Sequence, residues 1–196
     1  MISAIILAAG ESSRFGEPKV LYKINNKSFL ELILENILKI KDINEIILVL
    51  GYNFNEIVKK INKSKNIRIV ENKNYKNGQL SSFQTGIKNI RRDNKGIFMI
   101  LVDYPFVKYE TYKKMIDTFK EKNYQNIVIP TYNNKKGHPV IFPFKLIKEI
   151  LNAPLNEGAR YVVNKYKDLI KLIETDDKYI LKDIDYKKDL KIVNEE

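Results

Sequence analysis

Cysteine is absent from this chain of 196 residues, and histidine occurs once, at position 138. Without cysteine the chain has no disulfide framework and no thiolate to bind a metal ion or act as a nucleophile. A single histidine is more often structural than catalytic. We therefore expect the chemistry of this protein to depend on carboxylates, lysines and arginines.

Long hydrophobic runs are also absent. The apolar stretch at the amino terminus is too short to span a bilayer, and no basic segment precedes it as in a secretory signal. We therefore expect a soluble, cytoplasmic protein with no membrane partner. Hydrophobic residues at 44% and charged residues at 30% are typical of a globular chain. Since no repeat or linker is visible, we expect one domain covering residues 1–196.

Acidic residues are outnumbered by basic ones. The chain has 24 Asp and Glu against 35 Lys and Arg, which gives a net charge of +11. Such an excess attracts polyanions. However, the sequence contains no dense Lys/Arg block and no nucleic-acid-binding module. We therefore expect no nucleic-acid partner.

Strand-like and helix-like stretches alternate along the chain. Apolar, mostly β-branched runs predict strands at residues 2–7, 45–50, 67–70, 97–102, 126–129, 140–142, 169–173 and 179–181. Apolar side chains at helical spacing predict helices at residues 28–40, 53–62, 80–90, 109–121, 144–151 and 155–166. Ser28 and Glu31 form a capping-box pattern at the first helix. The alternation predicts an α/β fold, a Rossmann-like, doubly wound, mostly parallel sheet with helices on both faces.

The first predicted strand runs directly into the loop Leu7-Ala8-Ala9-Gly10-Glu11-Ser12-Ser13-Arg14-Phe15-Gly16-Glu17-Pro18-Lys19. Consecutive small residues leave backbone N–H groups within reach of a nucleotide. Ser12 and Ser13 add hydroxyls, and Arg14 and Lys19 add two cations, which suits a triphosphate. The loop is neither a Walker A motif nor a Gly-x-Gly-x-x-Gly motif. The alternative is an ordinary connection with solvated cations.

Carboxylates follow two later stretches of the chain. Asp103 comes directly after the apolar strand at 97–102, where a carboxylate would face the ligand crevice and bind Mg²⁺. It could instead cap the helix that follows. Asp183 and Asp185 would share one face of an extended segment, with Ile184 opposite. Spacing alone does not choose between them as metal ligands, and a solvated acidic turn is a further alternative.

Two other polar segments stand out. The stretch from Asn72 to Ser82 opens a predicted helix, and its free N–H groups and hydroxyls suit a base edge or a phosphate. Plain helix capping by Ser81 or Ser82 is the alternative. Gly137-His138-Pro139 precedes a predicted strand and is a weak pattern by itself.

Taken in order, these motifs resemble those of nucleotidyltransferases with a nucleotide-diphospho-sugar transferase fold, and among them most of all the molybdenum cofactor cytidylyltransferases. The first loop matches L-A-A-G-x-S-x-R-x-G-x-P-K throughout, and residues 72–82 resemble N-x-x-[WY]-x-x-G-x-x-S-S. Asp103 matches the Asp of Gly-Asp-x-Pro, although Val102 replaces the usual Gly. Residues 183–189 match D-I-D-T-P-E-D in part, with Tyr186 and Lys187 in place of Thr and Pro. Residues 137–139 and 158–160 match the family's Gly-His-Pro and G-x-R.

The resemblance implies roles for these residues. It implies catalysis by Arg14, Lys19 and Asp103. It implies a Mg²⁺ ion, or Mn²⁺ in its place, held by Asp103 with Asp185 or Asp183. The nucleotide-binding residues that it implies are Leu7, Ala8, Ala9, Gly10, Ser12, Ser13, Arg14, Lys19, Gly78 and Ser82. The second-substrate residues that it implies are Gly137, His138 and Arg160.

The implied reaction transfers CMP from CTP to the molybdopterin cofactor and releases pyrophosphate. A phosphate acceptor needs no general base, because it is already largely dianionic at neutral pH, with a second pKa of about 6. The alternatives are a guanylyl- or other nucleotidyltransferase acting on molybdopterin or on a sugar or alcohol phosphate, and a non-catalytic nucleotide-binding relative. Guanylyl relatives typically carry Gly at the position of Ala9, which favours CTP. A transient contact with a molybdoenzyme or its chaperone is also implied.

Overall fold

The computed structural model describes residues 1–61, 67–91 and 93–193, with side chains described up to residue 191. Its centre is an eight-stranded sheet in the order β10-β7-β9-β6-β1-β4-β5, with β8 paired to β7. Strand β1 pairs in parallel with β4 and β6, and β9 lies antiparallel between β6 and β7. The strands are β1 (Ile2–Ala8), β4 (Ile43–Leu50), β5 (Ile67–Glu71), β6 (Gly96–Leu101), β7 (Ile127–Tyr132), β8 (Lys135–Lys136), β9 (Val140–Pro143) and β10 (Ile170–Glu174). The predicted mostly parallel, Rossmann-like sheet is confirmed.

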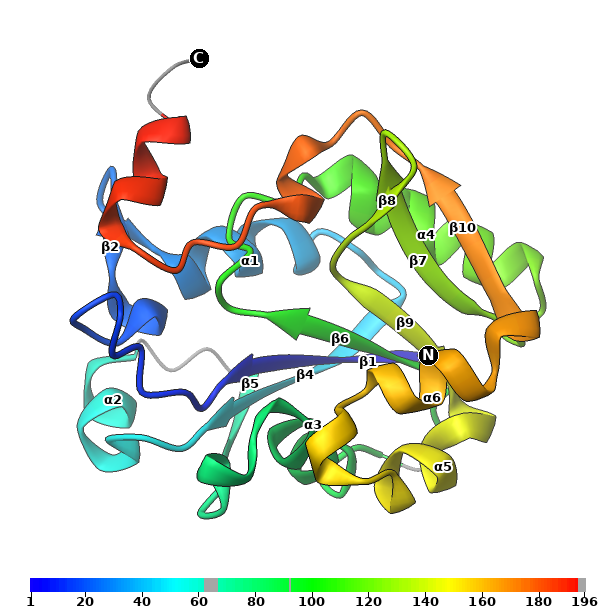
Figure 1. Cartoon of the computed structure of the whole chain (residues 1–196), viewed down its shortest axis with the longest axis horizontal. Helices are drawn as coiled ribbons and strands as arrows, with labels where there is room; N and C mark the ends of the chain where they lie inside the picture. Colours follow the sequence, from blue (N-terminus) through cyan, green and yellow to red (C-terminus); the bar gives the residue numbers. More distant parts are fainter. Residues whose placement is uncertain (62–66, 92, 194–196) are drawn as a thin grey trace.

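Helices cover both faces of this sheet (Figure 1). The helices are α1 (Phe29–Ile37), α2 (Phe54–Lys60), α3 (Gln79–Ile87), α4 (Tyr109–Glu121), α5 (Ile147–Asn152) and α6 (Arg160–Lys165). Apolar side chains of α1, α2 and α4 pack in one core cluster, and those of α3, α5 and α6 pack in a second. The two clusters lie on opposite faces because alternate side chains of a strand point to opposite sides.

Strand β1 contributes to both clusters. Ile6 and Ala8 pack with the α1 and α4 side, whereas Ile5 and Leu7 pack with the α3 side. A strand that is buried on both faces needs apolar residues at every second position on each face, which explains the uninterrupted apolar run at residues 4–9.

The order of strands creates a crevice at the carboxyl end of β1. The chain passes from β1 to β4 and β5 on one side, and then returns to β6 on the other side of β1. Ligands of open α/β sheets bind at such a reversal of strand order. Figure 1 shows the carboxyl-terminal segment, in red, lying beside the blue loop that follows β1. The loop after β1, the end of β6 and the carboxyl-terminal segment are distant in sequence and meet at this edge of the sheet.

Several predicted elements differ in extent or type. The predicted strand at 179–181 is wrong, because residues Lys178–Leu181 form a 3₁₀ helix (η6). Asp177 starts that turn, since its carboxylate accepts the N–H of Tyr179 at 3.0 Å. The predicted helix at 155–166 is two pieces, Leu155–Glu157 (η4) and α6, separated at Gly158, where φ is +66°. The predicted helix at 144–151 begins as a 3₁₀ turn, Phe144–Leu146 (η3), before α5.

Two further points concern the first half of the chain. The capping box at Ser28 and Glu31 is confirmed, with both of its hydrogen bonds present. Residues 22–28 form a small hairpin, β2 (Lys23–Ile24) and β3 (Lys27–Ser28), which the sequence pattern did not indicate. The last residue of the helix predicted at 53–62 lies outside the described residues.

Among the described residues, none of the helices combines the length and the apolar character needed to cross a membrane.

Candidate active site

A cavity of about 410 Å³ lies at the carboxyl ends of β1 and β6. Its lining includes every residue that the sequence predicts for nucleotide binding: Leu7, Ala8, Ala9, Gly10, Ser12, Ser13, Arg14, Lys19, Gly78 and Ser82. It also includes Asp103 and Asp185, which come from two other parts of the chain. The structure therefore brings the first loop, the start of α3, the end of β6 and the carboxyl-terminal segment to one cavity.

The loop after β1 is shaped by Ser12. This residue has a φ of +53°, and its carbonyl accepts the N–H groups of Phe15 and Gly16 at 2.9 and 3.0 Å. Its hydroxyl accepts the backbone N–H of Lys19 at 3.3 Å. Gly16 also has a positive φ, +87°, which favours glycine. The result is a compact turn that returns the chain to the cavity, so that Arg14 and Lys19 both line it.

The opposite wall is formed by the start of α3. The side-chain amide of Asn72 donates to the hydroxyls of Ser81 and Ser82 at 2.9 and 3.0 Å. Ser81 in turn donates to the carbonyl of Gly78 at 2.8 Å, so its hydroxyl stabilises the helix start. A side chain on Gly86 would clash with Ile5 of β1, and glycine there lets α3 pack close to the sheet. Gly78 and Ser82 are thereby held at the cavity.

Both cations of the loop pair with one carboxylate. Lys19 Nζ lies 2.6 Å from one carboxylate oxygen of Asp185, and Arg14 Nη1 lies 3.2 Å from the other. The hydrogen bond from Lys19 is the main reason that the pKa of Asp185 is lowered. The side chain of Lys19 is 9% exposed and that of Arg14 is 68% exposed. Lys19 is thus the inner cation of the cavity, and Arg14 stands at its mouth.

Asp103 is the second carboxylate of the site, and its side chain is half-buried. Its Oδ1 is buried and has no hydrogen-bond partner among the described residues. Burial raises the pKa of Asp103 to about 6, against the opposing influence of nearby Lys19. The backbone N–H of Ile184 donates to the Asp103 carbonyl at 2.8 Å, which fixes the carboxyl-terminal segment beside the end of β6.

These carboxylates fit a divalent cation that also binds phosphate. No group of three or more His, Asp or Glu side chains within the described parts of the chain forms a complete metal site. Mg²⁺ in triphosphate sites needs only one or two protein carboxylates, with phosphate oxygens and water completing its shell. The unpartnered Oδ1 of Asp103 suits this role. Of the two alternatives for the second ligand, Asp185 lines the cavity, whereas Asp183 is exposed and is not among the described lining residues.

The residues predicted for a second substrate lie apart from this cavity. The His138 ring lies 5.0 Å from that of Tyr104, the residue after Asp103, and His138 N–H donates to the Ile180 carbonyl at 2.9 Å. Its Nδ1 is buried without a partner among the described residues, and burial lowers the pKa of His138 to about 4. Gly137 packs against Ile180, where a side chain would clash.

Arg160, the third predicted second-substrate residue, is exposed at the first position of α6. It is not among the described residues that line the cavity. The structure thus brings His138 and Gly137 close to the end of β6 through Tyr104, but it does not bring Arg160 to the cavity wall.

Some lining residues are not predicted as ligands from the sequence, although Tyr75 fills the [WY] position of the family motif at residues 72–82. Tyr75 and Gln79 line the cavity and belong to the polar segment at 72–82, but only Gly78 and Ser82 of that segment are predicted as ligands. Ile57 comes from α2, whose apolar spacing indicates no more than a core helix. Their roles follow from tertiary packing.

Comparisons with known proteins agree with this geometry. Residues 4–169 match the family model of the MobA-like NTP transferase domain. The molybdenum cofactor cytidylyltransferase of Escherichia coli (strain K12) is 26% identical over 188 residues, which cover 91% of this chain and 94% of that protein. A probable molybdenum cofactor guanylyltransferase of Bacillus cereus (strain AH820) is 28% identical, with 82% of this chain and 77% of that protein covered.

Solved structures show the same fold. The crystal structure of Rv0371c from Mycobacterium tuberculosis H37Rv superposes with a TM-score of 0.84 and 22% identity, over 100% of this chain and 99% of that chain. Its complex with manganese gives a TM-score of 0.79 and 21% identity, over 99% and 98%. At 22% and 21% identity, the similarity to these two structures shows the fold alone. The family match, which covers most of the chain, shows more: this protein belongs to the MobA-like NTP transferase domain family and is a nucleotidyltransferase.

Proposed function

We propose that this protein is a metal-dependent cytidylyltransferase that transfers CMP from CTP to the molybdopterin cofactor and releases pyrophosphate. The observation that carries the proposal is the meeting of Lys19, Arg14, Asp185 and Asp103 in one cavity at the end of β1. Two cations and two carboxylates are the groups needed to hold a triphosphate with a divalent ion. The relatives named above act on the molybdenum cofactor, which supports the choice of acceptor.

In the proposed reaction an oxygen of the acceptor's phosphate attacks the α-phosphorus of CTP. The new P–O bond forms while the bond from the α-phosphorus to the bridging oxygen of the β-phosphate breaks, and its electron pair leaves with pyrophosphate. Lys19 and Arg14 stabilise the negative charge that develops on the leaving group. Mg²⁺, or Mn²⁺, held by Asp103 and Asp185 would neutralise phosphate charge. Both cations then have to exchange Asp185 for phosphate oxygens.

No protein base is required in this scheme, because the acceptor phosphate is already an anion. This agrees with a cavity whose described polar lining consists of cations, carboxylates, hydroxyls and an amide. The low pKa of His138 means that its imidazole is neutral at physiological pH, so His138 adds no charge beside the acceptor. Its proposed role is to position the second substrate together with Gly137.

The test is pyrophosphate release from each of the four ribonucleoside triphosphates, with and without molybdopterin and with and without Mg²⁺. We expect release with CTP only when both acceptor and metal are present. An Asp103→Asn variant should lose this activity while keeping the fold. Acceptor-independent or metal-independent release by the parent protein would contradict the proposal.

The closest rival is guanylyl transfer, which the Bacillus relative brings into consideration. We expect Ala9 to favour CTP, because Ala9 lines the cavity and its methyl group would occupy space that a purine needs. A methyl group of a binding wall changes discrimination by about 1–3 kcal/mol. Ala9→Gly should therefore lower the ratio of kcat/KM for CTP to that for GTP without inverting it. A parent protein that prefers GTP would make it a guanylyltransferase.

A further inference from the structure

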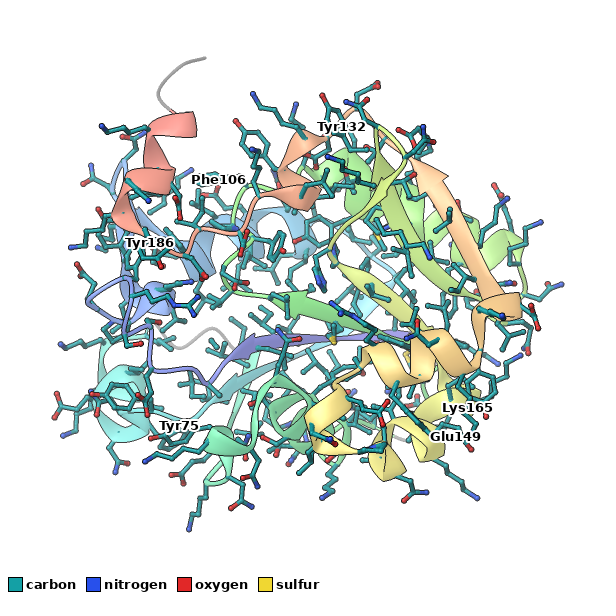
Figure 2. The ribbon with its side chains drawn as sticks, viewed as in Figure 1. Tyr75, Phe106, Tyr132, Glu149, Lys165 and Tyr186 are labelled. Carbon is teal, nitrogen blue, oxygen red and sulfur yellow. The ribbon has the colours of Figure 1, made fainter. Side chains whose placement is uncertain are left out.

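Two aromatic rings line the cavity, and they differ in how much surface they offer. Phe15 is fully buried and packs edge-on against Tyr22 and Phe29, with ring centroids 4.8 and 5.8 Å away. Tyr75 is half-buried and lies just before the start of α3 (Figure 2). Tyr75 is therefore the aromatic ring in the described lining that has a free face to offer to a ligand.

The position of Tyr75 is held by the residues that follow β4. A Cβ atom on Gly51 would lie 2.6 Å from the Cβ of Tyr75 and 2.8 Å from the carbonyl oxygen of Ala9. Only glycine allows the Tyr75 side chain and the Ala9 backbone to approach this closely. The next residue, Tyr52, donates its N–H to the Ala9 carbonyl at 3.1 Å, and its ring meets that of Tyr75 edge-on at 6.4 Å.

Tyr75 also reaches the loop after β1 with its hydroxyl. The hydroxyl donates to Oε1 of Glu11 at 3.5 Å, which is a long and therefore weak hydrogen bond. The backbone carbonyl of Tyr75 accepts the N–H of Gly78 at 3.1 Å, which joins Tyr75 to the start of α3. Tyr75 thus lies between the two segments, Ala8–Gly10 and Gly78–Ser82, that contain predicted nucleotide-binding residues.

We propose that Tyr75 is a nucleobase-binding residue, whose ring forms one wall of the base subsite and is set in place by Gly51 and Tyr52. The inference rests on the proposed function, since it needs a nucleotide in this cavity. Stacking on an aromatic ring tolerates any base, because every base has a π-face. Tyr75 therefore contributes affinity for the base in general, whereas Ala9 contributes the choice between pyrimidine and purine.

The test measures binding of CTP, GTP and inorganic tripolyphosphate, each with Mg²⁺, by calorimetry on the full chain. Tripolyphosphate has the phosphates without a base. Tyr75→Leu keeps apolar bulk but removes the π-face, so affinity for CTP and GTP should fall about fivefold to a hundredfold. Its affinity for tripolyphosphate should stay within about twofold of the parent value. Tyr75→Phe is the matched control, and it should bind CTP within about threefold of the parent.

A Gly51→Ala variant tests the positioning of the ring without changing Tyr75. We expect the same selective loss of CTP and GTP affinity. If this variant does not fold, the comparison of Tyr75→Leu with Tyr75→Phe still tests the inference. Unchanged CTP affinity in Tyr75→Leu, or an equal loss of tripolyphosphate affinity, would overturn the inference. A parent that binds CTP without releasing pyrophosphate would refute the proposed function and leave the Tyr75 comparison valid.

Discussion

The side chain of Lys19 is much less exposed to solvent than that of Arg14, and we therefore expect the two residues to contribute unequally to catalysis. A buried cation acts through a lower effective dielectric than an exposed one. We expect Lys19→Ala to reduce kcat/KM by about a hundredfold to a thousandfold, or roughly 3–4 kcal/mol. Arg14→Ala should cost about tenfold, because solvent screens its charge.

Steady-state pyrophosphate release with CTP and saturating acceptor measures both effects. Lys23→Ala is the control, since this exposed lysine follows the same loop but is not among the described lining residues of the cavity. Equal losses in the Lys19 and Arg14 variants would show that burial does not rank the two cations.

Asp103 is predicted to make the metal-free protein less stable at neutral pH. Its pKa of about 6 in the folded protein exceeds the value of about 4 expected for the unfolded chain. The folded state therefore holds the proton more tightly, and its free energy of unfolding falls as the pH rises from 4 to 6. Asp103→Asn should raise the free energy of unfolding by about 2–3 kcal/mol at pH 7.5 and change it little at pH 4.

Urea unfolding in the presence of a chelator, at pH 4 and at pH 7.5, measures this difference. The exposed Asp176 supplies the control, because Asp176→Asn removes the same charge without relieving burial. An Asp103→Asn variant that is no more stable than the parent at pH 7.5 would contradict the prediction.

At the scale of elements, Asp177 joins η6 to the start of α4. Its buried carboxylate accepts the backbone N–H groups of Lys108 and Tyr179 and the hydroxyl of Thr111, at 2.8 to 3.0 Å. Removal would leave three donors without their acceptor, two of them on the buried residues Thr111 and Tyr179. We expect Asp177→Ala to lower the free energy of unfolding by about 2–4 kcal/mol. Thermal and urea unfolding measure the loss, and Asp176→Ala, with almost no expected effect, is the matched neighbour.

The same aspartate explains why one element could not be predicted from the sequence. Tyr179-Ile180-Leu181 has the composition of a strand, but the capping bonds of Asp177 bend the backbone into a 3₁₀ turn. The same carboxylate is held in place by Lys108 and Thr111 at the start of α4, about seventy residues earlier in the chain, and the local sequence does not indicate these contacts. In contrast, β1, β4 and β6 are apolar over most of their length because both of their faces are covered, and that pattern is local.

The candidate site also has one part that the local sequence predicts and another part that depends on contacts between distant segments. The loop at residues 7–19 could be predicted because the residues that line the cavity from it are contiguous in sequence. Which of Asp183 and Asp185 lines the cavity could not be predicted, because it depends on the hydrogen bond from Ile184 to Asp103, a contact between distant segments. Tyr75 fills the [WY] position of the family motif, but its place at the cavity could not be predicted, since that place is set by Gly51 of another strand connection.

At the scale of the whole molecule, the two core clusters share the strands of one sheet. Strand β1 has side chains in both clusters, so neither cluster can lose its packing while the other stays intact. The expectation that the chain forms one domain therefore leads to a prediction of one cooperative unfolding transition. Far-ultraviolet circular dichroism and tyrosine fluorescence should give coincident urea curves, and two separate midpoints would count against it.

The bridge between Asp185 and the two loop cations has a consequence for turnover. Asp185 competes with phosphate for Lys19 and Arg14. Because it belongs to the same chain, it pairs with them without the loss of translational freedom that a separate molecule incurs. In the proposed reaction it would weaken the first binding of a triphosphate, and it would pair again with Lys19 and Arg14 once the bond to pyrophosphate has broken. In the proposed reaction this exchange would help pyrophosphate to leave, because Asp185 replaces the phosphate oxygens that the two cations lose.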